Sequence, residues 1–257
     1  MMMRRVVTNF KNVNRQFGQL RSYTQQQKPN ITLFGAEGDN PLAFHVLKQI
    51  AHRSGKIRIQ TTDAASTRRA LENLEGVDQS QFEIIQALTT DDYSVESAVY
   101  GADAVINVDR VLIEAERGYL DVYVNGVSNI AHFAEKHDVS KLIHTSVMGA
   151  DLDHESRFLD VNYRGEDIAY GSFPNVTVIR PNFATFGDRG SIVELFRRKL
   201  PLKLSPIIPY PAQAGALKIQ PVHIGDVAQA ISKSLFDKDV SGRVLQLGGS
   251  QTYTFPE

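Results

Sequence analysis

The feature that most constrains this chain is a regular alternation of short apolar runs with longer amphipathic ones, which begins at Asn30. Strands of a parallel sheet read as short apolar runs, and the helices that cover them read as amphipathic segments. The alternation therefore predicts an α/β fold with a doubly wound, parallel Rossmann-type sheet. The expected strands are 31–34, 57–61, 82–85, 104–108, 141–145, 176–180 and 243–247. The expected helices are 41–52, 66–73, 93–100, 125–137, 162–171, 192–199 and 224–236.

The alternation breaks down from about Pro181 onward, and residues 201–211 are apolar and rich in proline. Proline in a helix interior removes a hydrogen bond and clashes with the preceding turn, so this segment is not a long helix. It is either a packed loop or a contact surface for a partner or for lipid headgroups. We expect one Rossmann-type domain over 30–257, in which 181–257 contribute a small C-terminal lobe. A chain of 257 residues is long enough for one such domain with a sizeable core.

The first 29 residues form a separate compositional unit. Residues 1–30 contain six basic residues and no acidic one, and the first acid of the chain is Glu37. A basic, acid-free leader rich in polar residues is typical of a mitochondrial transit peptide. The alternatives are a disordered basic arm and a retained N-terminal arm held by a partner.

Composition excludes several classes of function. After the leader the chain carries 22 basic and 29 acidic residues, and an acidic body is a poor binder of nucleic acid. The absence of cysteine excludes disulfides, iron–sulfur ligation by thiolates and a cysteine nucleophile. His132 and His137 lie five residues apart, off one helical face, so we expect no zinc site. The apolar runs are too short to span a bilayer, which leaves only peripheral membrane contact.

The first expected strand runs into a glycine loop, Gly35-Ala-Glu37-Gly38-Asp39-Asn40-Pro41. The spacing G-x-x-G between a strand and a helix is typical of a dinucleotide loop, but proline stands at the third glycine position. Asn40 followed by Pro41 also suits an ordinary capped helix that needs no nucleotide.

Asp39 lies where a pyrophosphate would approach this loop. Two charges 4 Å apart interact with about 4 kcal/mol at an effective dielectric of about 20. A helix N-terminus stabilises an anion by only about 0.3–1 kcal/mol. Repulsion therefore wins if Asp39 faces the phosphates, and it has little effect if the side chain points to solvent.

Several segments resemble the atypical, extended branch of the short-chain dehydrogenase/reductase family. They are ITLFGAEG at 31–38, GADAVINV at 101–108, VYVNGVSNIA at 122–131, KLIHTSVMGA at 141–150, VIRP at 178–181, FG at 186–187 and QPVHIGDVA at 220–228. The likeness is strongest to the group of this family that supplies accessory subunits to mitochondrial respiratory complex I. For that group it implies a tightly held NADP(H) without turnover, other complex I subunits of the matrix arm as partners, and a seat near the quinone site on the matrix side of the inner membrane.

The resemblance also assigns cofactor-binding positions in this sequence. They are Gly35, Glu37, Gly38, Asp39, Asn40, Thr62, Leu88, Asn107, Ser146, Arg180 and Pro181. Thr62 stands where NADPH-binding relatives carry an arginine, so the bidentate phosphate clamp is absent. The acid that often contacts adenine is replaced by Leu88, and Asp91 and Asp92 are expected to cap the next helix. Arg58, Arg68 and Arg69 are candidates for a substitute clamp, but solvated charges are the better explanation of them. The family continues into a helical tail after the point that matches Glu257, so part of the usual clamp is absent from this sequence.

The catalytic pair of the family is degenerate. Active members use Tyr-x-x-x-Lys, in which the lysine charge favours the phenolate and the tyrosine moves a proton while hydride is transferred. The resemblance places these positions at Phe158 and Asn162, and none of the nine tyrosines is followed four residues later by lysine. The serine of the family is present as Ser146, but the sequence supplies no general base or general acid to act with it. We therefore expect no catalytic residues and no metal, and a non-catalytic accessory subunit that stabilises the matrix arm. The alternatives are an active NADP-dependent reductase or epimerase that uses Ser146, and a binding module for RNA.

Overall fold

The computed structural model describes residues 28–38, 40–111, 114, 117–187 and 218–254. The leader up to residue 27, Asp39, the expected helix at 192–199 and the proline-rich segment at 201–211 lie outside the described residues. Among the described residues, no helix is both long and apolar enough to cross a bilayer.

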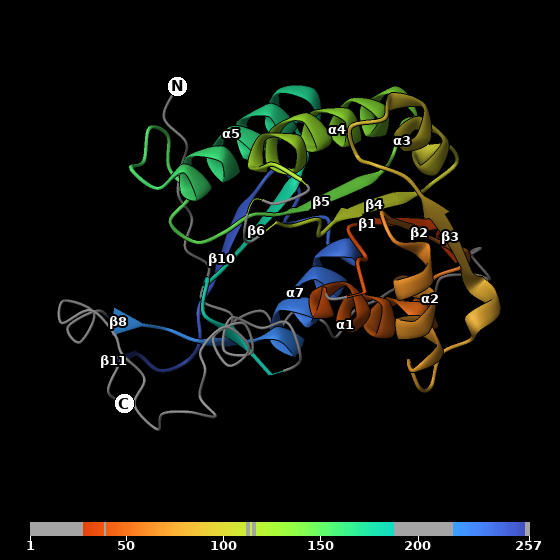
Figure 1. Cartoon of the computed structure of the whole chain (residues 1–257), viewed down its shortest axis with the longest axis horizontal. Helices are drawn as coiled ribbons and strands as arrows, with labels where there is room; N and C mark the ends of the chain where they lie inside the picture. Colours follow the sequence, from red (N-terminus) through yellow and green to blue (C-terminus); the bar gives the residue numbers. More distant parts are fainter. Residues whose placement is uncertain (1–27, 39, 112–113, 115–116, 188–217, 255–257) are drawn as a thin grey trace.

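A seven-stranded sheet forms the centre of the molecule, and all its neighbouring strands are parallel (Figure 1). The strand order is β10-β6-β5-β4-β1-β2-β3, which confirms the doubly wound arrangement. The strands are β1 (Ile31–Phe34), β2 (Ile57–Thr61), β3 (Phe82–Gln86), β4 (Ala104–Asn107), β5 (Lys141–Thr145), β6 (Thr177–Pro181) and β10 (Val244–Leu247). Strand order reverses between β1 and β4, so the crevice for a ligand is expected at the carboxyl ends of these two strands.

Helices cover both faces of this sheet (Figure 1). One face carries α1 (Pro41–Ile50), α2 (Ala64–Glu72) and α7 (Ile224–Phe236). The other face carries α3 (Asp92–Val99), α4 (Val127–Lys136) and α5 (Arg157–Ser172). Single turns continue or precede these elements: the 3-10 helices η2 (Ala51–Arg53) and η3 (Gln79–Gln81), and the π-helical η4 (Asp121–Gly126).

Each face of the sheet has its own hydrophobic core, because successive strand residues point to opposite sides. Ile31 and Leu33 of β1 pack with α1 and α7, whereas Phe34 packs with α3, α4 and α5. Strands β1 and β4 are buried along their whole length, as expected for the middle of a parallel sheet.

Most expected elements are found within a few residues, and two differ in an informative way. The helix expected at 162–171 begins earlier, at Arg157, because Phe158 and Val161 gain apolar contacts that a local reading of the polar stretch misses. The helix expected at 125–137 begins with the π-helical η4 at Asp121, since Gly126 packs against Thr89 and leaves no room for a side chain there. In both cases tertiary packing extends a helix that local propensity would start later.

Residues after Pro181 form two small sheets and also contribute one helix and one strand to the seven-stranded sheet and its cover. Strands β7 (Thr185–Phe186) and β9 (Val222–His223) pair in parallel, and β8 (Lys218–Ile219) pairs antiparallel with β11 (Tyr253–Thr254). Helix α7 packs on α1, and β10 completes the main sheet beside β6. Part of the expected C-terminal lobe therefore belongs to the Rossmann-type core.

Candidate functional site

The glycine loop after β1 lies where the dinucleotide cleft is expected. Gly35 has φ +87°, a conformation that side chains rarely adopt. A Cβ on Gly35 would lie 2.2 Å from the Cα atom of Asp109, which follows β4. A Cβ on Gly38 would lie 1.8 Å from Oγ of Ser66 in α2. Both glycines are thus required by close approach of other residues.

Asn40 holds the loop in place instead of capping α1 with its side chain. Its Nδ2 donates to the carbonyl of Gly35 at 2.7 Å and to that of Val108 at 2.9 Å. The residue stands at the N-cap position and Pro41 opens the helix as expected, but the side chain makes no capping hydrogen bond. The expected capping by the Asn40 side chain is wrong. Its amide group instead donates to two buried carbonyls at the ends of β1 and β4, which would otherwise lack this donor. The carbonyl oxygen of the Asn40 side chain is buried without a partner among the described residues.

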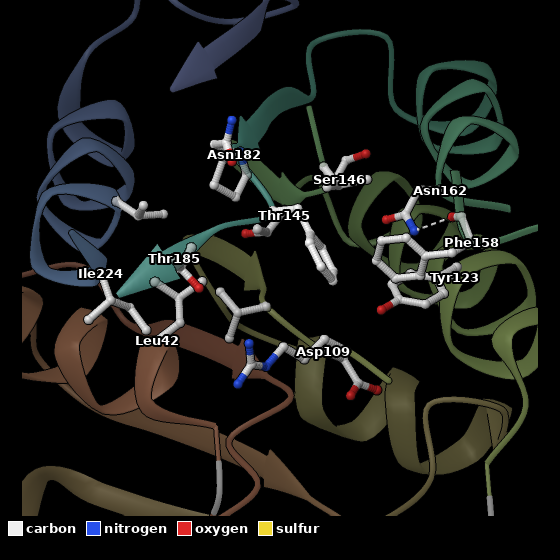
Figure 2. Close-up of a pocket in the computed structure, with 16 residues that line it drawn as sticks. Leu42, Asp109, Tyr123, Thr145, Ser146, Phe158, Asn162, Asn182, Thr185 and Ile224 are labelled. Atoms are coloured by element: carbon white, nitrogen blue, oxygen red, sulfur yellow. Dashed lines mark hydrogen bonds between the residues drawn. The ribbon is translucent and has the colours of Figure 1, made fainter. Parts of the chain in front are cut away.

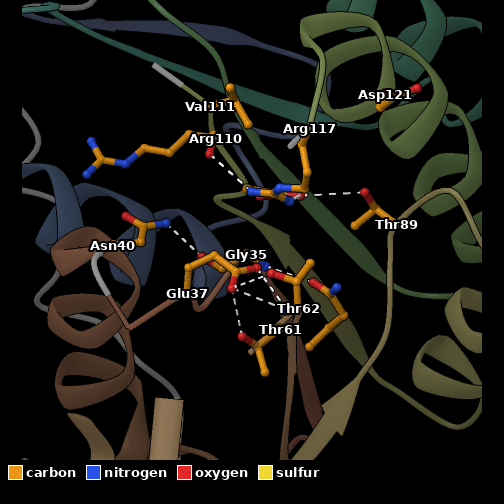
Figure 3. A network of polar contacts seen from close by, with 12 residues as sticks. Gly35, Glu37, Asn40, Thr61, Thr62, Thr89, Arg110, Val111, Arg117 and Asp121 are labelled. Atoms are coloured by element: carbon orange, nitrogen blue, oxygen red, sulfur yellow. Dashed lines mark hydrogen bonds and ion pairs between the residues drawn. The ribbon is translucent and has the colours of Figure 1, made fainter. Parts of the chain in front are cut away.

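Glu37 reaches from the glycine loop to the carboxyl end of β2 (Figure 3). Its carboxylate accepts the backbone N–H of Thr62 at 3.0 Å, the hydroxyl of Thr62 at 2.8 Å and the hydroxyl of Thr61 at 3.0 Å. Gln60 supports this arrangement, since its Oε1 accepts from the N–H of Gly35 at 3.1 Å. The loop is thereby fixed across the ends of β1 and β2.

A second carboxylate in the cleft was not anticipated from the sequence. Arg117 donates through both terminal nitrogens to Asp109, at 2.9 and 3.0 Å, and Asp109 is almost fully buried. Burial raises the pKa of Asp109, and the bidentate Arg117 guanidinium opposes that rise. The signal for Asp109 was its place directly after a strand, and no local pattern identifies Arg117 as its partner.

The outer end of the cleft lacks the charges that were considered as a phosphate clamp. Arg58 donates to the carbonyls of Ala98 and Tyr100, at the other end of β2, and Arg68 and Arg69 are exposed on α2. Leu88 follows β3 and is 50% exposed. The carboxylate of Asp91 accepts from the N–H of Ser94, which confirms it as the cap of α3.

Phe158 and Asn162, to which the family resemblance assigns the positions of the catalytic pair, both make contacts within the protein. Phe158 lies edge-on to the rings of Tyr119, Tyr123 and Phe183, with centroids 5.6–5.8 Å apart. Nδ2 of Asn162 donates to the carbonyl of Phe158, one turn earlier in α5, at 2.7 Å (Figure 2). Aromatic packing of this kind contributes about 0.5–1.5 kcal/mol per pair beyond area burial.

Tyr123 lines the same cavity as Ser146, and its hydroxyl is bonded to the backbone of Val111. It accepts from the N–H of Val111 at 3.0 Å and donates to the carbonyl of Val111 at 2.8 Å. Burial raises the pKa of Tyr123, which disfavours the phenolate. The ammonium group of Lys141 lies at the opposite end of β5 from Ser146, bonded to the carbonyl of Asp237 and the hydroxyl of Ser241.

A cavity of about 80 Å³ lies between Ser146, Tyr123 and Phe158 (Figure 2). The side-chain oxygens of Thr145 and Ser146 are buried there without a hydrogen-bond partner among the described residues. Cavities that enclose drug-sized ligands measure roughly 300–1,000 Å³. This volume is enough for a few water molecules.

The remaining expected site residues lie deeper. Arg180 forms a bidentate ion pair with Glu166 at 2.7 and 2.6 Å, so it does not face the crevice, whereas Pro181 lines the cavity. Asn107 accepts from the N–H of Asp109 at 3.0 Å and lies 3.3 Å from Nδ1 of His144. The buried His144 has a partner at Nδ1 only, since its Nε2 is buried without a partner among the described residues. Among the described residues, no group of three or more histidines and carboxylates could hold a metal ion.

Two curated relatives resemble the chain over much of its length. It is 29% identical over 228 residues to the mitochondrial NADH-ubiquinone oxidoreductase 40 kDa subunit of Neurospora crassa, covering 88% of this chain and 57% of the relative. It is 31% identical over 169 residues to the mitochondrial NADH dehydrogenase [ubiquinone] 1 alpha subcomplex subunit 9 of Dictyostelium discoideum, covering 65% of this chain and 45% of the relative. The chain thus spans about half the length of the curated relatives it matches.

A solved structure supports the fold. Yeast methylglyoxal/isovaleraldehyde reductase, complexed with NADPH, superposes with a TM-score of 0.68 at 16% identity, covering 88% of this chain and 79% of the reductase. The family model of 3-beta hydroxysteroid dehydrogenase/isomerase matches residues 36–166, from the glycine loop to the middle of α5. With the glycine loop, the strand order and this match in agreement, the chain belongs to the 3-beta hydroxysteroid dehydrogenase/isomerase family.

Proposed function

We propose that this chain is a non-catalytic accessory subunit of mitochondrial respiratory complex I, which contributes its folded shape to the matrix arm on the inner side of the inner membrane. The names of the relatives from Neurospora and Dictyostelium support the assignment to complex I. The basic, acid-free leader supports a mitochondrial destination. Its partners would be other subunits of that arm, with membrane contact only through the complex.

One observation carries the non-catalytic part of the proposal: Phe158 and Asn162 occupy the positions of the proton donor and its lysine. Phenylalanine has no proton to transfer, and the amide of Asn162 is used within α5. Loss of a positioned acid or base typically lowers a rate about 10²–10⁴-fold. Tyr123 does not substitute, because both hydrogen-bonding directions of its hydroxyl are used by Val111.

The same proposal includes a dinucleotide held without turnover. The loop that contains Gly35 and Gly38 lies between β1 and α1, where this fold binds a dinucleotide, although Asp109 and Ser66 already pack against the two glycines. Pro41 removes one N–H from the helix end that would bind the pyrophosphate. NADP(H) is the form that the family resemblance implies. When bound, the cofactor would supply only rigidity, because the residues around Ser146 do not provide a proton.

Assembly is tested by native gel electrophoresis of mitochondria from cells that carry a tagged copy of this chain. We expect the tag to migrate with complex I. A tagged chain that migrates only as a free monomer in the matrix would overturn the proposal.

The Ser146→Ala variant separates a structural role from a catalytic one. We expect it to assemble normally and to leave NADH:ubiquinone activity of the complex unchanged, since no reaction at Ser146 is needed. An active reductase or epimerase is favoured by the unpartnered hydroxyl of Ser146 in the cavity. Oxidation of NADH or NADPH above the buffer rate with carbonyl substrates, abolished in Ser146→Ala, would establish that alternative instead.

A further inference from the structure

The carboxylate of Glu37 occupies the place where the cofactor classes of this fold differ. In Rossmann-type folds an acid near the end of the second strand binds the ribose hydroxyls of NAD, whereas an arginine there accommodates the 2′-phosphate of NADP. Thr62 is the first residue after β2, and its N–H and hydroxyl both donate to Glu37 (Figure 3). Glu37 therefore supplies from the glycine loop the carboxylate that other chains carry at the strand end.

We propose that Glu37 excludes a 2′-phosphate from the cleft, so that the nucleotide this chain accepts is NAD(H) and not NADP(H). A phosphate monoester carries a charge of about −1.5 to −2 at pH 7, and Glu37 would place a like charge beside it. Like charges brought together at a binding site cost several kcal/mol, which exceeds a tenfold change in affinity. An unphosphorylated ribose instead offers two hydroxyl donors to the same carboxylate.

Three hydrogen bonds keep Glu37 in this place. Its oxygens accept from Thr61 and Thr62 at 2.8–3.2 Å, and Thr61 is itself fully buried. Turning Glu37 away would leave these donors without an acceptor, which carries a free-energy cost. The same three donors would be open to a phosphate once the carboxylate is removed, so the exclusion resides in Glu37 and not in the rest of the pocket.

Two of the described arginines are bonded to other groups of the chain. Arg58 is bonded at the opposite end of β2, and Arg117 is bound by Asp109 through both terminal nitrogens. The exposed Leu88, after β3, gives adenine an apolar surface that is indifferent to the 2′ position. The inference rests on the part of the proposed function in which the cleft holds a dinucleotide, and not on assembly with complex I.

The test is a titration of the purified chain with NADH and with NADPH, followed by the fluorescence of the reduced nicotinamide, since the chain contains no tryptophan. We expect NADH to bind at least about tenfold more tightly than NADPH. ADP-ribose should compete with NADH more strongly than its 2′-phosphorylated form does. Because neither competitor carries a nicotinamide, this result would assign the discrimination to the adenosine end of the nucleotide.

Glu37→Gln removes the charge at nearly constant volume, and Glu37→Ala also opens the space around the three donors. We expect NADPH affinity to rise about tenfold in both variants and the preference for NADH to disappear. Glu72→Gln, which removes an exposed carboxylate from α2, is the matched control and should keep the preference. Thermal melting monitored by circular dichroism verifies that each variant is folded.

Equal or tighter binding of NADPH by the unaltered chain would overturn the proposal, as would an unchanged ratio in a folded Glu37→Gln variant. The proposal would also be overturned if neither NADH nor NADPH binds. None of these results bears on migration with complex I, so failure here and failure of the assembly proposal are distinguishable.

Discussion

At the residue scale, buried polar groups decide what helix α5 does in this chain. Asn162 bonds within the helix, and Glu166, one turn later, forms the buried ion pair with Arg180 of β6. Glu166 and Arg180 expose only 1% and 6% of their side chains, so each depends on the other for solvation. The face of α5 that carries catalytic groups in active relatives is thus used to attach the helix to the sheet.

The Glu166→Gln variant should lose about 3–5 kcal/mol of unfolding free energy, because it leaves the Arg180 guanidinium buried without a counter-charge. Urea unfolding measures this loss. Asp160→Asn removes the partner of the exposed Arg164 on the same helix and should cost much less, because that ion pair is open to solvent at the arginine. Similar losses in the two variants would show that the buried pair does not stabilise the fold as argued.

His144 predicts a pH dependence of stability. Burial lowers its pKa from 6.5 to about 4 in the folded chain. As the pH falls, the unfolded chain takes up the proton first, so the contribution is complete above pH 6.5 and is lost toward pH 4, by roughly 3 kcal/mol in total. Unfolding free energies at several pH values should fall less steeply in His144→Gln than in the unaltered chain. His132→Gln, at an exposed position, controls for loss of a histidine as such.

At the scale of elements, α5 and η4 approach each other closely beside the cavity that Ser146 and Tyr123 line. A Cβ on Gly165 would lie 2.1 Å from the carbonyl oxygen of Tyr123, so the helix approaches the π-helical segment as closely as its backbone permits. This approach brings Tyr123 against Phe158 and directs its hydroxyl to Val111. Helix packing thereby holds the hydroxyl of Tyr123 on the backbone of Val111.

Gly165→Ala should therefore destabilise the chain by about 1–3 kcal/mol, because it forces α5 away from η4. Gly171→Ala lies in the same helix with nothing within 4 Å, and should stabilise it by about 0.5–1 kcal/mol through helix propensity. Thermal or chemical unfolding of both variants measures the difference. Equal effects of the same sign would contradict the role of the Gly165 contact.

At the scale of the whole molecule, the last described elements close both the sheet and one of its cores. Strand β10 pairs along β6, and α7 packs on α1 with several fully buried apolar residues, among them Val227 and Ile231. Without them, β6 would become an exposed edge and one face of α1 would be open to water.

A chain that ends at His223 should consequently fail to unfold cooperatively, whereas one that ends at Leu247 keeps α7 and β10 and should unfold in a single transition. The first truncation removes buried apolar area from the core that α1 and α7 share. Circular dichroism during thermal denaturation measures the cooperativity. A sharp transition in the shorter chain would show that the sheet folds without its last strand.

The sequence by itself determined the architecture, because strand and helix identity depend on local periodicity. The β-α alternation predicted all seven strands of the sheet within one residue at either end, and the α7 bounds Ile224–Phe236 agree with the segment expected. The sequence also determined the absence of the Tyr/Lys pair, since Phe158 and Asn162 can be read directly once the family is recognised. These properties depend on residue types and short spacings alone.

The tertiary structure decided how the polar groups of the cleft are paired. Glu37 meets Thr62 across 25 positions of the chain, Arg180 meets Glu166 across 14, and Asn40 serves Val108 across 68. The sequence favoured a capping role for Asn40 and did not predict Glu37 as the partner of Thr62, because local patterns contain no information about distant partners. A buried donor or acceptor is satisfied by whichever group the fold brings within hydrogen-bond distance, and that distance is set only when the strands are placed side by side.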